Sequence, residues 1–197
     1  MSALDGILPS PGDVASAVSA PPLLSLTKPA ESHAFYTGSI VDNNCAGVVF
    51  AAEQSFYEGT GWVSMRKQEL ADAQDAAAIK YSVIEAVVAF QDAGTAAKFY
   101  QRASDIFHKC ANRTLNVRDV NVTDQGQAFE MVGPVSEKDG IVSASLLWEG
   151  GDGRNCQRGV SAHNNIAIDI SVCGYSVPDS VSPALIKPIA AKIDTAR

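Results

Sequence analysis

Four cysteines constrain the fold of this 197-residue chain more than any other feature of its sequence. They are Cys45, Cys110, Cys156 and Cys173, and no two of them form a C-x-x-C pair. Without such pairs, neither a tetrahedral zinc site nor thioredoxin-type redox chemistry is expected, and no metal site is predicted. The question is therefore which cysteines pair with which, since four allow three pairings.

The register of a predicted β-hairpin favours one of these pairings. If Asn164 and Asn165 form its two-residue tip, residues at equal distances from the tip face each other across the hairpin. Cys156 lies eight residues before Asn164, and Cys173 lies eight residues after Asn165. They would share one face at a separation that a disulfide can close, which leaves Cys45 with Cys110. The alternative is four unrelated buried thiols.

Two disulfides would place the chain in an oxidising compartment, as a secreted or cell-envelope protein. The same hairpin register places Arg158 opposite Ser171 and diagonal to Asp169, which predicts an ion pair beside the second disulfide. Alternate residues, from Ile166 to Val172, would point to the other face and form core.

Hydrophobic spacing predicts helices before and after a run of strands. Apolar residues three to four apart indicate helices over residues 43–58 and 92–110, the first capped by Asn43 or Asn44. Residues 61–66 and 81–90 are rich in aromatic and β-branched residues and indicate strands. A closing helix begins at the Ser182-Pro183 pair, and Pro188 is expected to kink or split it.

From Arg113 onward the pattern has period two, with turn residues every eight to twelve positions. The turns are expected at 123–126, 137–140, 150–153 and 164–165, which describes an antiparallel meander of about five strands. The predicted fold class is α+β, an antiparallel sheet with flanking helices. Residues 1–30 hold five of the nine prolines and are expected to form a lead or tether, so that residues 31–197 make up one domain.

Charge and hydropathy exclude several classes of partner. Lys and Arg number 15 against 22 Asp and Glu, a formal net charge of −7, and no cationic cluster is present that could bind nucleic acid or an anionic membrane. No apolar run approaches the roughly 20 residues that span a bilayer. The first residues also lack the features of a signal peptide, so any export signal or membrane anchor is expected outside these residues.

The sequence contains no complete match to the serine-hydrolase or phosphate-loop motifs. The nearest approach to the G-x-S-x-G elbow of serine hydrolases runs from Gly159 to His163, but it lacks the second glycine and precedes a strand. Ser161 and His163 would share a strand face, which keeps an envelope hydrolase open as an alternative. The glycines at 150–153 precede no Lys-Ser or Lys-Thr pair and open no helix, so a hairpin turn is predicted there and not a phosphate loop.

Several segments together resemble one known family. They are Cys45-Ala-Gly-Val-Val-Phe, Gly61-Trp62 with Gln68-Glu-Leu, Val87-Val88-Ala-Phe90 with Cys110 after it, Cys156-Gln-Arg158, and Asn164-Asn165 with Asp169 before Cys173. This pattern, over roughly residues 25–197, resembles the extracellular sensor domain of mycobacterial PknH-type serine/threonine kinases, which also occurs on stand-alone lipoproteins. The resemblance implies disulfides in sequential order and a large open cleft for an unidentified ligand. No kinase motif is present in these residues.

The leading hypothesis is therefore a non-catalytic sensor domain of the periplasm or cell surface, anchored or secreted. Its partner would be a small molecule, lipid, glycan or peptide in the cleft, with no cofactor. The candidate contacts are Trp148, Arg158, His163 and Asn164. The competing hypotheses are the hydrolase and a protein-interaction domain without a small ligand.

Overall fold

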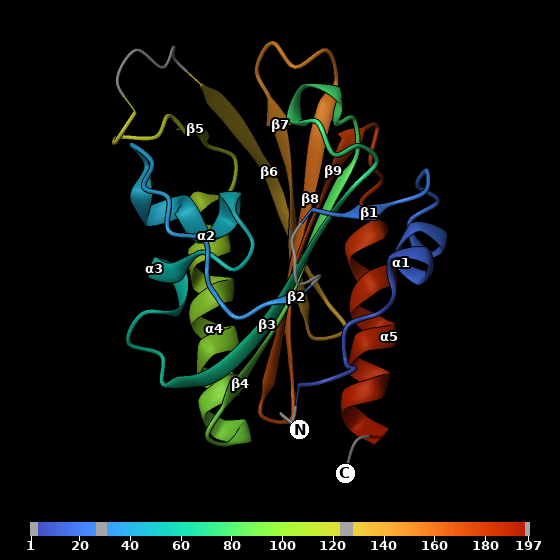
Figure 1. Cartoon of the computed structure of the whole chain (residues 1–197). Helices are drawn as coiled ribbons and strands as arrows, with labels where there is room; N and C mark the ends of the chain where they lie inside the picture. Colours follow the sequence, from blue (N-terminus) through green and yellow to red (C-terminus); the bar gives the residue numbers. More distant parts are fainter. Residues whose placement is uncertain (1–3, 27–30, 123–127, 196–197) are drawn as a thin grey trace.

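A large antiparallel sheet forms the middle layer of the molecule, with helices against both faces (Figure 1). This computed structural model describes residues 4–26, 31–122 and 128–195. The strand order within them is β1-β3-β4-β9-β8-β7-β6-β5, and β2 also pairs with β3. The strands are β1 (Leu24–Ser25), β2 (Glu31–Ser32), β3 (Trp62–Ala71), β4 (Ser82–Phe90), β5 (Thr114–Asn116), β6 (Phe129–Lys138), β7 (Ile141–Trp148), β8 (Arg154–His163) and β9 (Ile166–Tyr175).

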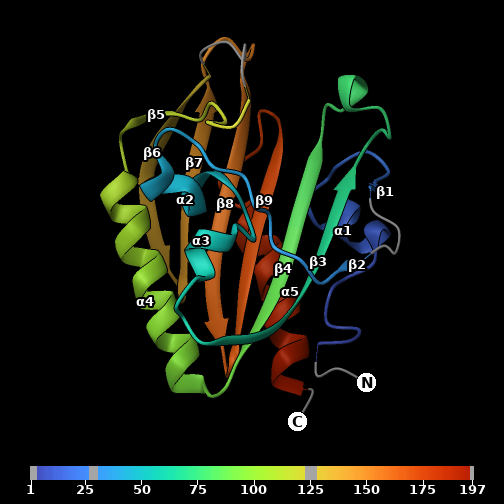
Figure 2. The same ribbon diagram turned by 60° about the vertical axis from the view of Figure 1, so that its left-hand side comes forward.

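The helices form one group on each side of the sheet (Figures 1 and 2). They are α1 (Pro11–Ala17), α2 (Ala46–Val49), α3 (Gln54–Tyr57), α4 (Ala93–Cys110) and α5 (Val181–Thr195), with 3-10 turns η1 (Asn43–Cys45) and η2 (Ala76–Ala78). α2, α3 and α4 share one hydrophobic core with the sheet, and α1 and α5 share the other. Because strand residues alternate, β8 sends Val160 into the first core while its neighbour Gly159 meets α5.

The fold class and the meander are confirmed. Strands β5 to β9 are sequential neighbours in the sheet, as period-two spacing and regular turns predict. Asp139 and Gly140 both have positive φ in the β6–β7 turn, and Asn164 has a φ of 51° at the β8–β9 tip. The expected turn at 123–126 lies outside the described residues.

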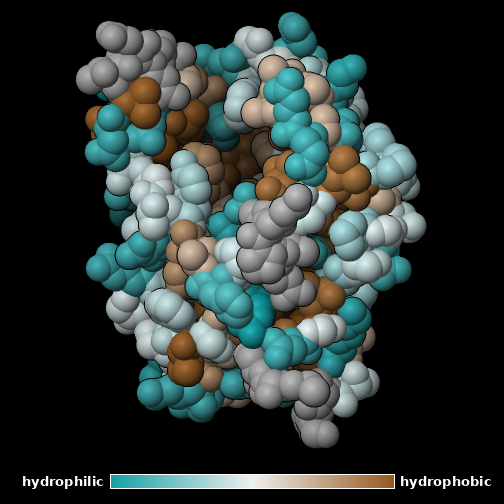
Figure 3. Space-filling view, viewed as in Figure 1, coloured by the Kyte–Doolittle hydropathy of each residue, from teal (hydrophilic) through white to brown (hydrophobic). Residues whose placement is uncertain are grey.

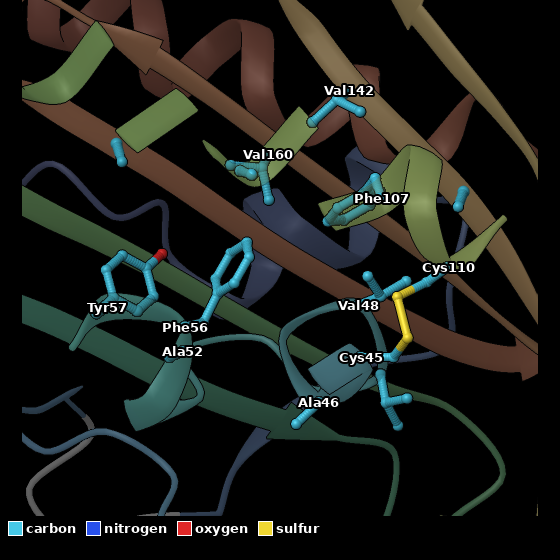
Figure 4. Close-up of a cluster of buried hydrophobic side chains, with 14 of the residues drawn as sticks. Cys45, Ala46, Val48, Ala52, Phe56, Tyr57, Phe107, Cys110, Val142 and Val160 are labelled. Atoms are coloured by element: carbon cyan, nitrogen blue, oxygen red, sulfur yellow. A yellow bond between two sulfur atoms is a disulfide. The ribbon is translucent and has the colours of Figure 1, made fainter. Parts of the chain in front are cut away.

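Both disulfides are present in the predicted pairing. Cys156 and Cys173 are register partners with Cα atoms 4.0 Å apart, near the spacing of a non-hydrogen-bonded strand pair. Cys45 joins Cys110, which ties η1 to the end of α4. Figure 4 shows the Cys45–Cys110 disulfide among the aromatic and aliphatic side chains of the α4 core.

The proline-rich lead is more closely packed than its composition predicts. Residues 11–17 form α1, which Ser10 caps by accepting from the backbone N–H of Asp13, with Pro11 opening the helix. Leu4 and Val14 are fully buried in the α5 core, and β1 pairs with β3. A few apolar side chains thus fix the lead although it lacks a regular hydrophobic period.

The single helix predicted over residues 43–58 is wrong. The segment folds as η1, α2 and α3, with an extended Phe50 and an Ala52 of positive φ between the last two. The positions predicted to face the core do face it, including Cys45, Val48 and Phe56. The helix breaks because a buried arginine, described below, donates hydrogen bonds to carbonyls that a continuous helix would use for its own backbone.

Of the two outcomes expected for Pro188, a kink or a split of the closing helix, the split does not occur. The helix runs unbroken from Val181 to Thr195, and Pro188 lies on its exposed side. There, water can satisfy the carbonyl that loses its partner to the proline ring.

Candidate functional site

An open cleft lies at one end of the sheet, on the side that α4 covers lower down. Figure 3 shows it as a hollow over the upper ends of β6, β7 and β8, with hydrophobic residues in its interior. One wall is the β5 side of the molecule, where residues 39–42 run beside residues 118–120. The other is the end of the β3–β4 hairpin that carries η2 (Figure 1).

Three side chains form a polar cluster on the α4 face of the strand ends over which this cleft lies: Glu130 of β6, Trp148 of β7 and Arg154 of β8. These strand ends are called the floor of the cleft below. Glu130 and Trp148 are register partners. The guanidinium of Arg154 stacks over the Trp148 ring, with its central carbon 5.3 Å from the ring centroid. All three share the α4 face, since each lies two residues from a member of the α4 core, namely Val132, Leu146 or Cys156.

The cluster combines exposed and buried parts. The Trp148 side chain is 43% exposed, whereas Glu130 is 4% exposed. Burial raises the pKa of Glu130 to about 7, and the hydrogen bond from Trp148 and the charge of Arg154 oppose that rise. The Nε of Arg154 is buried and has no hydrogen-bond partner among the described residues. An arginine with an unused donor therefore lies beside a carboxyl that titrates near neutrality.

The floor beside this cluster is covalently fixed. Cys156, two residues from Arg154, is joined to Cys173 of β9. On the hairpin wall, Lys67 and Glu69 of β3 form an ion pair with Nζ and Oε1 2.7 Å apart. The charges of that wall thus compensate each other, whereas no ion pair with the guanidinium of Arg154 is found among the described residues.

Arg158, a predicted ligand contact, is a fully buried residue below the cleft. Its Nη2 lies 2.8 Å from Oδ1 of Asp169, and both side chains are completely inaccessible, which confirms the predicted ion pair. Its N–H groups are directed at four backbone carbonyls, those of Gly47, Val48, Phe50 and Ile170. Three of these belong to the segment that fails to form one helix, which explains its break.

Asp169 completes this buried network. Its Oδ2 accepts from the backbone N–H of Ala52 at 2.8 Å and from the Tyr57 hydroxyl at 2.9 Å. Burial and the charge of Asp169 raise the pKa of Tyr57, so its hydroxyl remains a donor. Arg158 and Asp169 therefore hold the α2–α3 segment on the sheet, and neither reaches the surface of the cleft.

The other candidate contacts lie far from Trp148. His163 and Asn164 are at the β8–β9 tip, roughly 30 Å along β8 from the end that carries Arg154. Asn164 donates from Nδ2 to Asp194 of α5. The four predicted contacts therefore do not form one site, and Trp148 is the one that lies in the cleft.

The pair behind the hydrolase alternative is also accounted for. Ser161 is completely buried on the α5 side of the sheet, and its hydroxyl has no hydrogen-bond partner among the described residues. Among the described residues, no hydrogen bond joins the Ser161 hydroxyl to His163. A substrate could not reach this hydroxyl without movement of α5.

The sequence prediction missed Glu130 and Arg154. A signal for Arg154 existed, since it lies directly opposite Trp148 when the β7–β8 register is extended by one pair beyond Leu147 and Asn155. Glu130 stands at an inward position of a period-two strand, two residues before Val132. A charged residue at such a position is a recognisable exception to the pattern.

A second hollow lies beside α3, at the start of β3. It has a volume of about 350 Å³, and Trp62, Phe35, Gln54 and Glu58 are among its lining residues. Trp62 is 40% exposed, and its ring meets that of Phe35 edge to face. The two tryptophans of the chain therefore mark two separate concave surfaces.

Comparisons with known proteins agree with this architecture. Residues 1–192 match the sequence profile of the PknH-like extracellular domain. The chain is 28% identical over 151 residues, 76% of its length, to serine/threonine-protein kinase PknH from Mycobacterium bovis and from Mycobacterium tuberculosis. It spans less than a quarter of the length of these kinases, 23% and 22% respectively.

The fold matches a solved structure. The crystal structure of the extracellular domain of PknH from Mycobacterium tuberculosis superposes with a TM-score of 0.85 at 21% identity, covering 96% of this chain and 93% of that one. None of the described helices is both long and apolar enough to cross a membrane. The chain belongs to the PknH-like extracellular domain family.

Proposed function

We propose that this chain is a non-catalytic sensor domain outside the cytoplasm that binds its ligand in the cleft above β6, β7 and β8. One observation carries the proposal: an exposed tryptophan with an arginine stacked on it, on a disulfide-linked floor inside an open hollow. Aromatic and charged groups that converge in a concavity are typical of a ligand site.

Binding without chemical transformation is supported by what the cleft contains. Glu130 and Arg154 have no nucleophile beside them among the described contacts, and the hydroxyl of Ser161 lies on the opposite side of the sheet. The family match is to the extracellular part of a kinase, which favours recognition over catalysis.

A sensor at the cell surface requires a connection to a membrane. We propose that a segment outside these residues anchors the domain, either as a lipid-modified leader or as part of a larger receptor. The curated relatives are kinases about four times as long as the matched region. The ligand is a small molecule, lipid, glycan or peptide of the cell envelope.

The two tryptophans allow a direct test. Trp62→Phe leaves Trp148 as the sole tryptophan, and Trp148→Phe leaves Trp62 as a matched control. Envelope lipids, glycans and peptides are screened by thermal shift, because any ligand of the native state raises the unfolding temperature. We expect hits to change the fluorescence of the Trp62→Phe protein and to lose affinity for the Trp148→Phe protein.

The proposal is refuted if no probe stabilises the protein at large excess. It is also refuted if every stabilising probe changes only the fluorescence of Trp62, since binding would then be at the α3 hollow.

A further inference from the structure

We propose that the cleft selects a ligand in which an anionic group adjoins an apolar segment, with Arg154 as the anchor for the anion and Glu130 as its internal competitor. The inference rests on the proposed function and specifies its ligand class.

Arg154 is the one charged residue of the floor that is set up to hold an anion. Stacking on Trp148 occupies one face of the guanidinium and leaves the N–H groups at its edge available. No carboxylate lies within ion-pair distance of Arg154 in the described part of the chain. A planar guanidinium binds carboxylate, sulfonate or phosphate oxygens with two parallel hydrogen bonds.

A second arginine supports a preference for anions. Arg118 belongs to the wall beside β5, where its carbonyl accepts from the backbone N–H of Val41. Its Nε is also buried and lacks a partner within the described ranges. Two arginines with unused buried donors thus belong to two of the segments around the hollow, β8 and the wall beside β5, whereas Lys67 on β3 is already paired.

The surroundings of these arginines are apolar. Figure 3 shows hydrophobic residues inside the hollow. Val41, Val120 and Val122 on the β5 side are each about half exposed, and the Trp148 ring adds a flat apolar surface. A fully polar anion would leave this surface wet, whereas an amphiphile would cover it and gain from its burial.

Glu130 lies where it can compete with the ligand for Arg154. It is held by Trp148 on β7, faces Leu115 across to β5, and the charge that acts on it comes from Arg154 on β8. When Glu130 is ionised, it lowers the positive potential at the guanidinium and repels an incoming anion. When it is protonated, the full charge of Arg154 is available.

The sign of the pH effect follows from the pKa of about 7 for Glu130. Below that pH the carboxyl is neutral and affinity for an anion is high; above it the carboxylate forms and affinity falls. Protonation changes of the ligand itself are avoided with a sulfonate, which stays ionised throughout.

Three probes test the ligand class with the Trp62→Phe protein, whose fluorescence reports on Trp148. They are 1-octanesulfonate below its micelle concentration, 1-octanol and inorganic sulfate. We expect octanesulfonate to bind most tightly. Equal or tighter binding of octanol would overturn the role of the anion, and equal binding of inorganic sulfate would overturn the role of the apolar segment.

Three variants test the residues. Arg154→Gln should weaken octanesulfonate binding about tenfold or more, the loss expected for hydrogen bonds to a charged group. Glu130→Gln should bind as tightly at pH 8 as the parent does at pH 6. Lys98→Gln, which removes one exposed positive charge on α4, should change neither affinity nor pH dependence. Circular dichroism establishes that each variant is folded, and Arg154→Lys, which keeps the charge without the fork, should fall between the parent and Arg154→Gln.

An unchanged affinity in folded Arg154→Gln, or a Glu130→Gln protein that retains the pH dependence of the parent, would refute this inference. In either case, a change of Trp148 fluorescence on addition of any of the probes would still support the proposed function, because it shows binding in the cleft. If none of the probes stabilises the protein or alters Trp148 while the broader screen yields a cleft ligand, the inference fails alone.

Discussion

Replacement of Arg158 by methionine should cost more stability than any other single substitution outside the disulfides. The change keeps much of the side-chain volume but removes the ion pair with Asp169 and the donors to four backbone carbonyls. Removing one partner of a fully buried pair costs about 3 to 5 kcal/mol, because the other charge stays buried without compensation. Since a domain of this size has roughly 5 to 15 kcal/mol of total stability, Arg158→Met should remove a large fraction of it.

Urea unfolding under non-reducing conditions, followed by circular dichroism, measures this cost. Tyr57→Phe should lose about 1.5 to 3 kcal/mol, the value of one hydrogen bond to a charged acceptor. Tyr100→Phe is its matched control, because the same hydroxyl is removed from an exposed contact with Glu137, and it should lose well under about 1 kcal/mol. A double variant, Arg158→Met with Asp169→Leu, should lose less than the sum of the two single changes.

The reasoning is refuted if Arg158→Met costs under about 1 kcal/mol with an unchanged dependence on urea. That result would mean that the α2–α3 segment keeps its conformation without the arginine, and that the hydrophobic contacts of the segment alone determine it.

Three further predictions concern stability. Replacing the cysteines of the η1–α4 disulfide by serine should cost about 4 kcal/mol and those of the β8–β9 disulfide about 3 kcal/mol, because the first closes a 65-residue separation and the second one of 17; the reverse order in urea unfolding would contradict the loop-entropy explanation. Burial raises the pKa of Glu85 from 4.5 to about 7, so its protonated form favours the native state and its contribution should fall by roughly 3 kcal/mol as pH rises through that interval. Stability curves of Glu85→Gln and the parent should therefore diverge with pH, and parallel curves would disprove this. Gly159→Ala should cost about 1 to 3 kcal/mol, because its new methyl group would lie 2.7 Å from Cβ of Ser182 on α5; an unchanged unfolding midpoint would show that α5 yields without cost.

Sequence patterns were sufficient for the central sheet because its strands obey local rules. The β8–β9 register followed from a two-residue tip and was confirmed together with its disulfide and its ion pair. α4 follows from its apolar stripe alone. These elements were predictable because neighbours in sequence determine them.

Elements that depend on distant partners were not predictable in the same way. The segment that carries α2 and α3 has the spacing of one helix, but Arg158, more than a hundred residues later, binds its carbonyls. In the candidate site, too, one residue was predictable from the sequence and two were not. Trp148 is conspicuous in the sequence, whereas Glu130 and Arg154 gain their meaning only when β6, β7 and β8 lie side by side.

The β8–β9 disulfide also constrains the order of events as the chain matures. Its two sulfurs meet only when these strands are aligned as in the native sheet, because a slip of a single residue would place Val172 or Gly174 opposite Cys156 and turn Cys173 to the opposite face. Oxidation must therefore follow strand pairing. Once formed, the crosslink makes every misaligned hairpin inaccessible, and the chain can refold after transient opening without searching for its alignment again.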